Sequence, residues 1–83
     1  MNKYKKVIDN KMRWQGDIDT ERHIIRINKA KSKKKSSIID TIIHEEMHAK
    51  HPRMYESTIR EETIKALNKM TPKQKSLKYN QYR

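Results

Sequence analysis

One short segment carries the apolar pattern that most limits how this chain can fold. Its apolar residues recur at the three- and four-residue spacing of an α-helix: Ile38, Ile39, Ile42, Ile43 and Met47. The stripe predicts a helix over residues 37–50, with Ser36 or Ser37 as its N-cap. Because only 33% of the 83 residues are hydrophobic and none is phenylalanine, the core must be thin. A bound metal could supply stability that such a core lacks.

Residues 44–48 of this helix read H-E-x-x-H. Because residues four apart lie one above the other, the imidazoles of His44 and His48 point the same way and can bind one cation. Both histidines fall outside the apolar stripe on a helical projection. Glu45 would lie beside the open position of the metal and accept a proton from a bound water, whereas Glu46 falls inside the stripe and needs a basic or hydroxyl partner. The alternative is a surface helix that carries these residues by chance.

Two segments before the helix have strand character. Residues 12–18 alternate loosely between apolar and polar, residues 23–27 are β-branched, and the polar residues 19–22 between them suit a turn. We therefore expect a short antiparallel hairpin over residues 12–28, packed on the motif helix. Gly16, the only glycine, indicates a bulge or a close backbone approach.

Two further helices follow the motif. Pro52 ends the motif helix. Apolar residues fall on one face of residues 55–70, which predicts a second helix antiparallel to the first. The sequence Thr71-Pro72-Lys73-Gln74 has the pattern of a capping box, which predicts a short helix over residues 71–83. The alternative for this segment is a flexible tail. The expected fold is one α+β domain over residues 1–83, with its core at about 12–70.

Composition excludes several classes of site and of protein. The chain has no cysteine, which rules out disulfides and thiolate metal ligands. Its basic start, Met1 to Lys6, has no apolar run behind it, so we expect neither a signal peptide nor a membrane span. A cytoplasmic protein is the expectation, in the host cytoplasm if the chain is encoded by a phage.

The charge is the second prominent feature. The formal net charge is +11, and five of the seven residues from Lys29 to Lys35 are lysine. We expect this stretch to be a solvated connection that could bind nucleic acid non-specifically, because such a basic field attracts polyanions. The other interpretation is that the lysines only keep a small protein soluble.

The hairpin followed by Ile38-Ile39-Asp40-Thr41-Ile42-Ile43-His44-Glu45-Glu46-Met47-His48 resembles the zincin-type metallopeptidases. The resemblance is to the small lysine-rich H-E-x-x-H proteins of phages and minimal bacteria, and more distantly to the SprT-like proteases and minigluzincins. It covers roughly residues 14–70. It implies a Zn²⁺ site and an edge strand that holds an extended peptide over the motif helix, a part that residues 23–28 would play.

The third metal ligand does not follow from the motif, because the metzincin extension H-x-x-G-x-x-H is missing. Four residues are candidates: His51, Glu56, Glu61 and Glu62. His51 lies about 10 Å along a continuous helix from His44, too far to share one zinc. If the chain reverses around residues 50–54, Glu56 returns level with His48. We therefore expect Glu56, or Glu61 or Glu62 if the turn falls later; otherwise Glu56 only stabilises a helix N-terminus.

Two functions fit these observations. The first is a zinc-dependent peptidase for a peptide or protein substrate, in which His44, His48 and Glu56 hold Zn²⁺ and Glu45 deprotonates the attacking water. The second is a basic protein that binds nucleic acid or an acidic protein and whose H-E-x-x-H motif is structural or vestigial. The sequence leaves the oligomeric state open.

Overall fold

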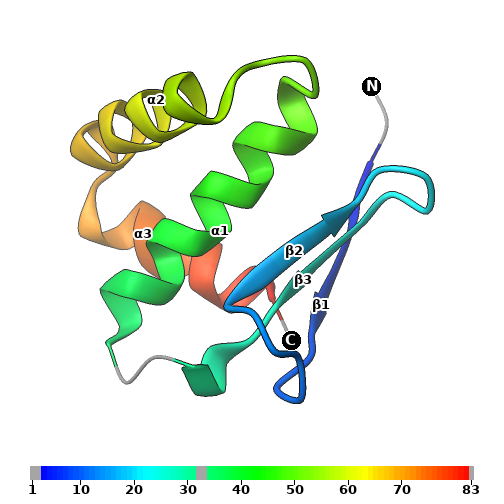
Figure 1. Ribbon diagram of the computed structural model, residues 1–83. Coiled ribbons are helices and arrows are strands. Elements are labelled where there is room, and N and C mark those ends of the chain that lie inside the picture. The colour runs from blue at the N-terminus through cyan, green and yellow to red at the C-terminus, as the bar shows by residue number, and fades with distance from the viewer. Residues whose placement is uncertain (1–2, 32–33, 83) are drawn as a thin grey trace.

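The computed structural model describes residues 3–31 and 34–82, which form an α+β domain of a mixed sheet and three α-helices (Figure 1). In chain order the elements are β1 (Lys5–Ile8), β2 (Gly16–Asp19), β3 (Ile24–Ile27), a 3-10 turn (Lys29–Lys31), α1 (Lys35–Lys50), α2 (Glu56–Lys69) and α3 (Pro72–Gln81). The predicted fold class is confirmed at this level. None of the helices in the described ranges is long and apolar enough to cross a membrane.

The predicted hairpin is present as β2 and β3, but its first strand is shorter and later than residues 12–18, because β2 begins at Gly16 and ends at Asp19. The two strands pair antiparallel, with Gly16 opposite Ile27, and the turn between them is held by Asp19, whose Oδ1 accepts hydrogen bonds from the backbone N–H groups of Glu21 and Arg22. β1 joins the other side of β3 in parallel, so the strand order is β1-β3-β2. β3 is therefore the central strand, and β2 forms an edge of the sheet.

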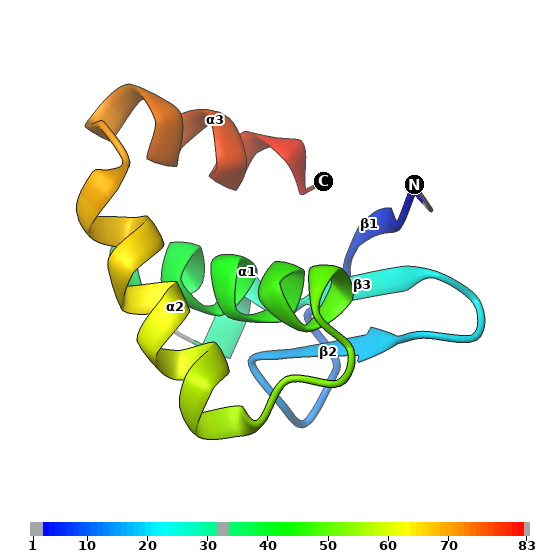
Figure 2. The same ribbon diagram turned by 90° about the horizontal axis from the view of Figure 1, so that it is seen from above.

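The core lies between the sheet and α1. Ile25 and Ile27 of β3 are buried against Ile38 and Ile42 of α1, the helix on which β2, β3, α2 and α3 all pack. Figure 1 shows α1 between α2 and the sheet, and Figure 2 shows α1 between α2 and α3. α2 turns back along α1 but crosses it obliquely (Figures 1 and 2). The predicted isoleucine stripe thus organises the domain.

The C-terminal segment belongs to the core, which extends beyond the predicted residues 12–70. α3 has the expected capping box, because Thr71 Oγ1 accepts from the backbone of Gln74 and the Gln74 side chain accepts from the backbone of Thr71. Tyr82 follows α3 and is 0% exposed in the main core cluster, against which Tyr4 and Ile8 also pack. The flexible-tail alternative is therefore wrong for the described residues.

Two expectations about the segment before α1 need correction. Lys29 is only partly exposed: its Nζ donates to the carbonyls of Tyr79 at 3.2 Å and Tyr82 at 2.8 Å, and burial lowers its pKa, whereas Lys31, Lys34 and Lys35 are exposed as expected. Lys35 begins α1 and its Nζ lies 4.8 Å from the centre of the Tyr79 ring. The N-cap is Lys34, without a side-chain cap, because the helix begins before the two serines. Ser32 and Lys33 lie outside the described residues.

Gly16 allows an unusually close approach between β2 and α1, as its position as the only glycine indicated. A Cβ atom at this residue would lie 2.8 Å from Cγ2 of Thr41 and 3.2 Å from Cδ1 of Ile27. Thr41 is itself fixed, because its Oγ1 contacts the carbonyl of Ser37 at 3.1 Å and Oε1 of Gln15 at 3.2 Å. Glycine therefore sets the distance between the edge strand and the motif helix.

We predict that Gly16→Ala destabilises the domain by about 1–3 kcal/mol through overpacking. Thr41→Ser removes Cγ2 and keeps the hydroxyl, so in that background Gly16→Ala should cost less. Urea unfolding of the wild type, both single variants and the double variant measures the coupling. An equal cost of Gly16→Ala in the two backgrounds would show that contact with Thr41 is not what requires glycine.

Candidate metal centre

The reversal after α1 carries Glu56 back to the two histidines. α1 ends at Lys50 with His51 as its C-cap, and the backbone N–H of Met54 donates to the His51 carbonyl at 3.1 Å, closing a tight turn. Glu56 is then the first residue of α2. The predicted position of Glu56, level with His48 after the chain reversal, is confirmed.

Three side chains converge at this point. Nε2 of His44 lies 2.8 Å from Oε1 of Glu56, and Nε2 of His48 lies 2.9 Å from Oε2. The two Nε2 atoms are 3.2 Å apart, and the rings meet edge to face with centroids separated by 4.9 Å. Lone pairs on three groups thus face one another. Protons on the ring nitrogens or a cation between them must offset that repulsion.

The donor set fits a divalent cation of the zinc type. In a tetrahedral zinc site with Zn–N and Zn–O bonds of about 2.0–2.1 Å, donor atoms are about 3.3 Å apart. In this cluster the two imidazoles are 3.2 Å apart and contact different oxygens of Glu56 at 2.8 and 2.9 Å, distances slightly shorter than that edge length. Two imidazoles and one carboxylate leave a fourth position open, which is the arrangement of catalytic rather than structural zinc sites.

The other candidate ligands lie elsewhere. Among the residues that the structure describes, the group of ligand-type side chains within 4.8 Å of one another is His44, His48 and Glu56. His51 is exposed at the end of α1. Glu61 is exposed, and Glu62 pairs with Lys65 at 3.5 Å. The α1–α2 turn is therefore early enough to bring Glu56, and not Glu61 or Glu62, next to the two histidines.

Glu45 lies beside the cluster in a cleft between α1, α2 and the start of β2. The cleft has a volume of about 560 Å³, and its lining includes His44, Glu45, Gly16, Arg60 and Ile64. Glu45 is buried, with only 8% of its surface exposed. Burial is the main cause that raises its pKa, opposed by the nearby His48 and reinforced by Asp17 and Glu56. Sequence analysis placed Glu45 at the site but did not predict this burial.

Glu46 has the structural role expected of it. It points to a different side of α1 from Glu45, where its carboxylate contacts Nζ of Lys78 at 2.8 Å and Nζ of Lys6 at 3.6 Å and accepts a hydrogen bond from the Tyr82 hydroxyl at 2.9 Å. The predicted basic and hydroxyl partners are both present. The network joins α1 to β1 and to the end of α3, which explains how a carboxylate is tolerated beside the isoleucine stripe.

Two parts of the site were missed or misplaced by sequence analysis. Arg60 lies one helical turn after Glu56, with its Nε 3.6 Å from Oε1 of Glu56, and it lines the cleft. The four-residue spacing from Glu56 was the signal that pointed to it. Residues 23–28 are not the edge strand over the motif helix, because β1 occupies the outer side of β3 and leaves β2 at the edge beside the cleft.

Comparison of the chain with protein-family models, with curated proteins and with solved structures finds no match in any of the three. The chemistry of the site therefore has to be inferred from its own side chains.

The two adjacent glutamates should respond oppositely to amide substitution. No hydrogen bond or ion pair holds the Glu45 carboxylate within the described ranges, and its pKa is raised on folding, so the charge opposes folding above that pKa. Glu45→Gln should leave the metal-free protein as stable or up to about 1 kcal/mol more stable at neutral pH, a difference that fades on acidification. Glu46→Gln should cost about 1–3 kcal/mol, because it disrupts a network of three partners.

Denaturant unfolding of both variants in the presence of a chelator measures these differences. A larger loss for Glu45→Gln than for Glu46→Gln would contradict the assignment of the two roles.

Proposed function

We propose that the protein is a zinc-dependent hydrolase of peptide bonds. The observation that carries the proposal is the convergence of two imidazole nitrogens and one carboxylate at the spacing of zinc ligands, next to a cleft that also contains a buried glutamate. His44, His48 and Glu56 would hold the metal. When bound, zinc supplies Lewis acidity, which polarises a carbonyl and makes water a stronger acid at neutral pH.

The residues of the chain divide the remaining work. Glu45 accepts the proton from the attacking water and returns it to the leaving amine, a task suited to a carboxylate held in a partly dry cleft next to the metal ligands. Arg60, 3.6 Å from Glu56, contributes positive charge to the same wall of the cleft. It therefore favours the negative charge that develops on the carbonyl oxygen during attack.

The edge of β2 offers a way to hold the substrate. The Asn28 backbone N–H donates to the carbonyl of Gln15 at 2.8 Å, which fixes the alternation of the β2–β3 ladder. The backbone groups of Gly16 and Ile18 then point away from β3, toward the outside of the sheet. An extended peptide that pairs with them lies along the cleft lined by Gly16, His44 and Glu45. We propose strand addition at β2 as the mode of substrate binding.

Zinc titration tests the metal ligands. Zn²⁺ should bind at one equivalent and raise the melting temperature of chelator-treated protein, because binding to the folded state stabilises it. Glu56→Gln should weaken zinc affinity by at least about tenfold, whereas Glu61→Gln and Glu62→Gln, matched substitutions on the same helix, should leave it nearly unchanged. Equal zinc affinity in all three variants would remove Glu56 from the ligand set.

Hydrolysis tests the proposed role of Glu45. The wild type with one equivalent of zinc should cleave members of a peptide library, and Glu45→Gln should retain zinc but lose cleavage by about a hundredfold or more, because an amide cannot accept the proton. Glu46→Gln, measured below its melting temperature, serves as the control and should retain activity. Zinc-dependent cleavage at equal rates by wild type and Glu45→Gln would contradict the proposed chemistry.

A further inference from the structure

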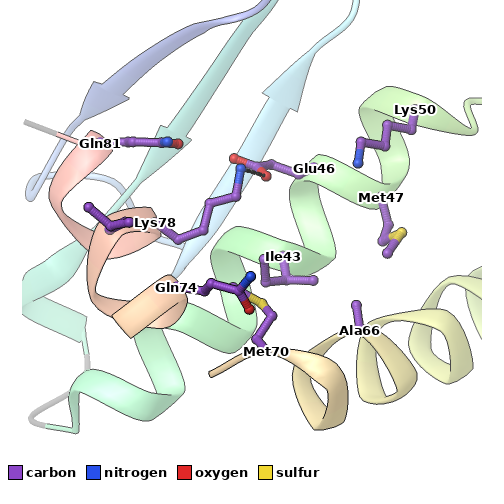
Figure 3. Close-up of a pocket in the computed structure, with 10 residues that line it drawn as sticks. Ile43, Glu46, Met47, Lys50, Ala66, Met70, Gln74, Lys78 and Gln81 are labelled. Atoms are coloured by element: carbon purple, nitrogen blue, oxygen red, sulfur yellow. Dashed lines mark ion pairs between the residues drawn. The ribbon is translucent and has the colours of Figure 1, made fainter. Parts of the chain in front are cut away.

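A second hollow shares no lining residue with the cleft that contains Glu45. It has a volume of about 370 Å³ and lies where α1, α2 and α3 meet (Figure 3). Its apolar floor is made by Ile43, Met47, Ala66, Met70 and Leu77. α2 and α3 each pack on α1 and leave this groove between them. We call it the three-helix groove.

The floor of the groove is suited to contact with another molecule. Leu77 is 57% exposed on α3, so the core does not use it. Met47 and Met70 extend toward the groove from the two sides in Figure 3, and methionine side chains adapt to partners of different shape. An exposed leucine beside two methionines is an apolar surface that a partner could bury.

The groove carries more positive than negative charge, because its lining among the described residues holds two lysines and one glutamate. From Thr63 to the end of the chain the sequence contains five lysines and no aspartate or glutamate. Lys50 and Lys78 lie at the rim; Lys78 is paired with Glu46, whereas Lys50 is exposed and has no ion-pair partner among the described residues. The one acid in the lining, Glu46, is already neutralised by Lys6 and Lys78. An occupant must therefore combine apolar side chains with negative charge.

We propose that the three-helix groove binds an acidic amphipathic helix of a partner protein. The walls are helices, whose backbone groups are satisfied internally, so the groove offers no strand edge and has to be recognised through side chains. A helix that places apolar residues at positions i, i+3 or i+4 and i+7 over the floor presents a flanking acid to Lys50, the exposed lysine at the rim.

Two other anionic partners fit the groove less well. Within the described part of the chain, the lining of the groove contains no aromatic residue on which a nucleic-acid base could stack. A membrane surface would contact a protruding apolar face, whereas these apolar residues line a hollow. The inference does not depend on the metal centre, whose lining residues are different.

The probe is a fluorescent synthetic helix of about five turns, with leucine on one face and glutamate on the other. Its control is a scrambled peptide with the same composition, which keeps the charge but loses the apolar face. Anisotropy at physiological ionic strength should give a Kd for the amphipathic peptide at least about tenfold below that of the scrambled one, because only the former buries apolar side chains.

Protein variants locate the binding surface. Leu77→Gln should weaken binding by about tenfold, whereas Ile64→Gln, which replaces an equally exposed residue (58% against 57%) on the wall of the other cleft, should change it less than about twofold. Lys50→Gln should reduce affinity more than Lys5→Gln, which removes an exposed lysine on β1. Because Leu77 and Lys50 are exposed, all four variants are expected to fold, and circular dichroism checks this.

Three results would overturn the proposal. Equal affinity for the amphipathic and scrambled peptides would mean that only charge is recognised. Equal effects of Leu77→Gln and Ile64→Gln would place binding outside the groove. The third result is that an oligothymidine or phosphatidylglycerol vesicles bind more tightly than the peptide and that Leu77→Gln does not weaken this binding. It would assign the basic surface to nucleic acid or to a membrane.

Discussion

Burial of the isoleucine stripe of α1 is the interaction on which the rest of the domain depends. Ile38 and Ile42 pack against β3, and α2 and α3 pack on the same helix. With 33% hydrophobic residues, the chain has little other apolar surface from which to build a core. Once this face of α1 is buried, the helical period directs His44 and His48 away from the core. The same constraint therefore fixes the fold and exposes the candidate ligands.

The features that the sequence predicted correctly are those that depend on local residue patterns and on short chain reversals. The motif helix, the hairpin and the capping box at Thr71 follow from periodicity and turn chemistry, and the position of Glu56 follows from helical rise and the turn at Pro52. Contacts between distant segments could not be predicted in this way. Lys6 and Lys29 reach α3 and its C-terminal residues over 75 and 50 residues of chain, and no periodicity indicates that pairing.

The position of β2 is the clearest example of a wrong expectation with a physical cause. Residues 23–28 have the stronger strand character, and that is why β3 lies at the centre of the sheet: its buried Ile25 and Ile27 are covered by α1, and both of its edges are paired. The weaker strand, with Gly16 at its start, forms the edge beside the cleft. In the proposed enzyme the substrate therefore meets the less apolar strand, whose outer edge is unpaired within the described sheet.

X-ray absorption at the zinc edge tests the central claim, that His44, His48 and Glu56 form one metal site, most directly. The zinc-loaded wild type should give four nitrogen or oxygen neighbours at about 2.0–2.1 Å, with the multiple-scattering features of two imidazoles. The contribution of one imidazole should disappear in His48→Ala. A spectrum without imidazole scattering, or one that His48→Ala leaves unchanged, would contradict the account.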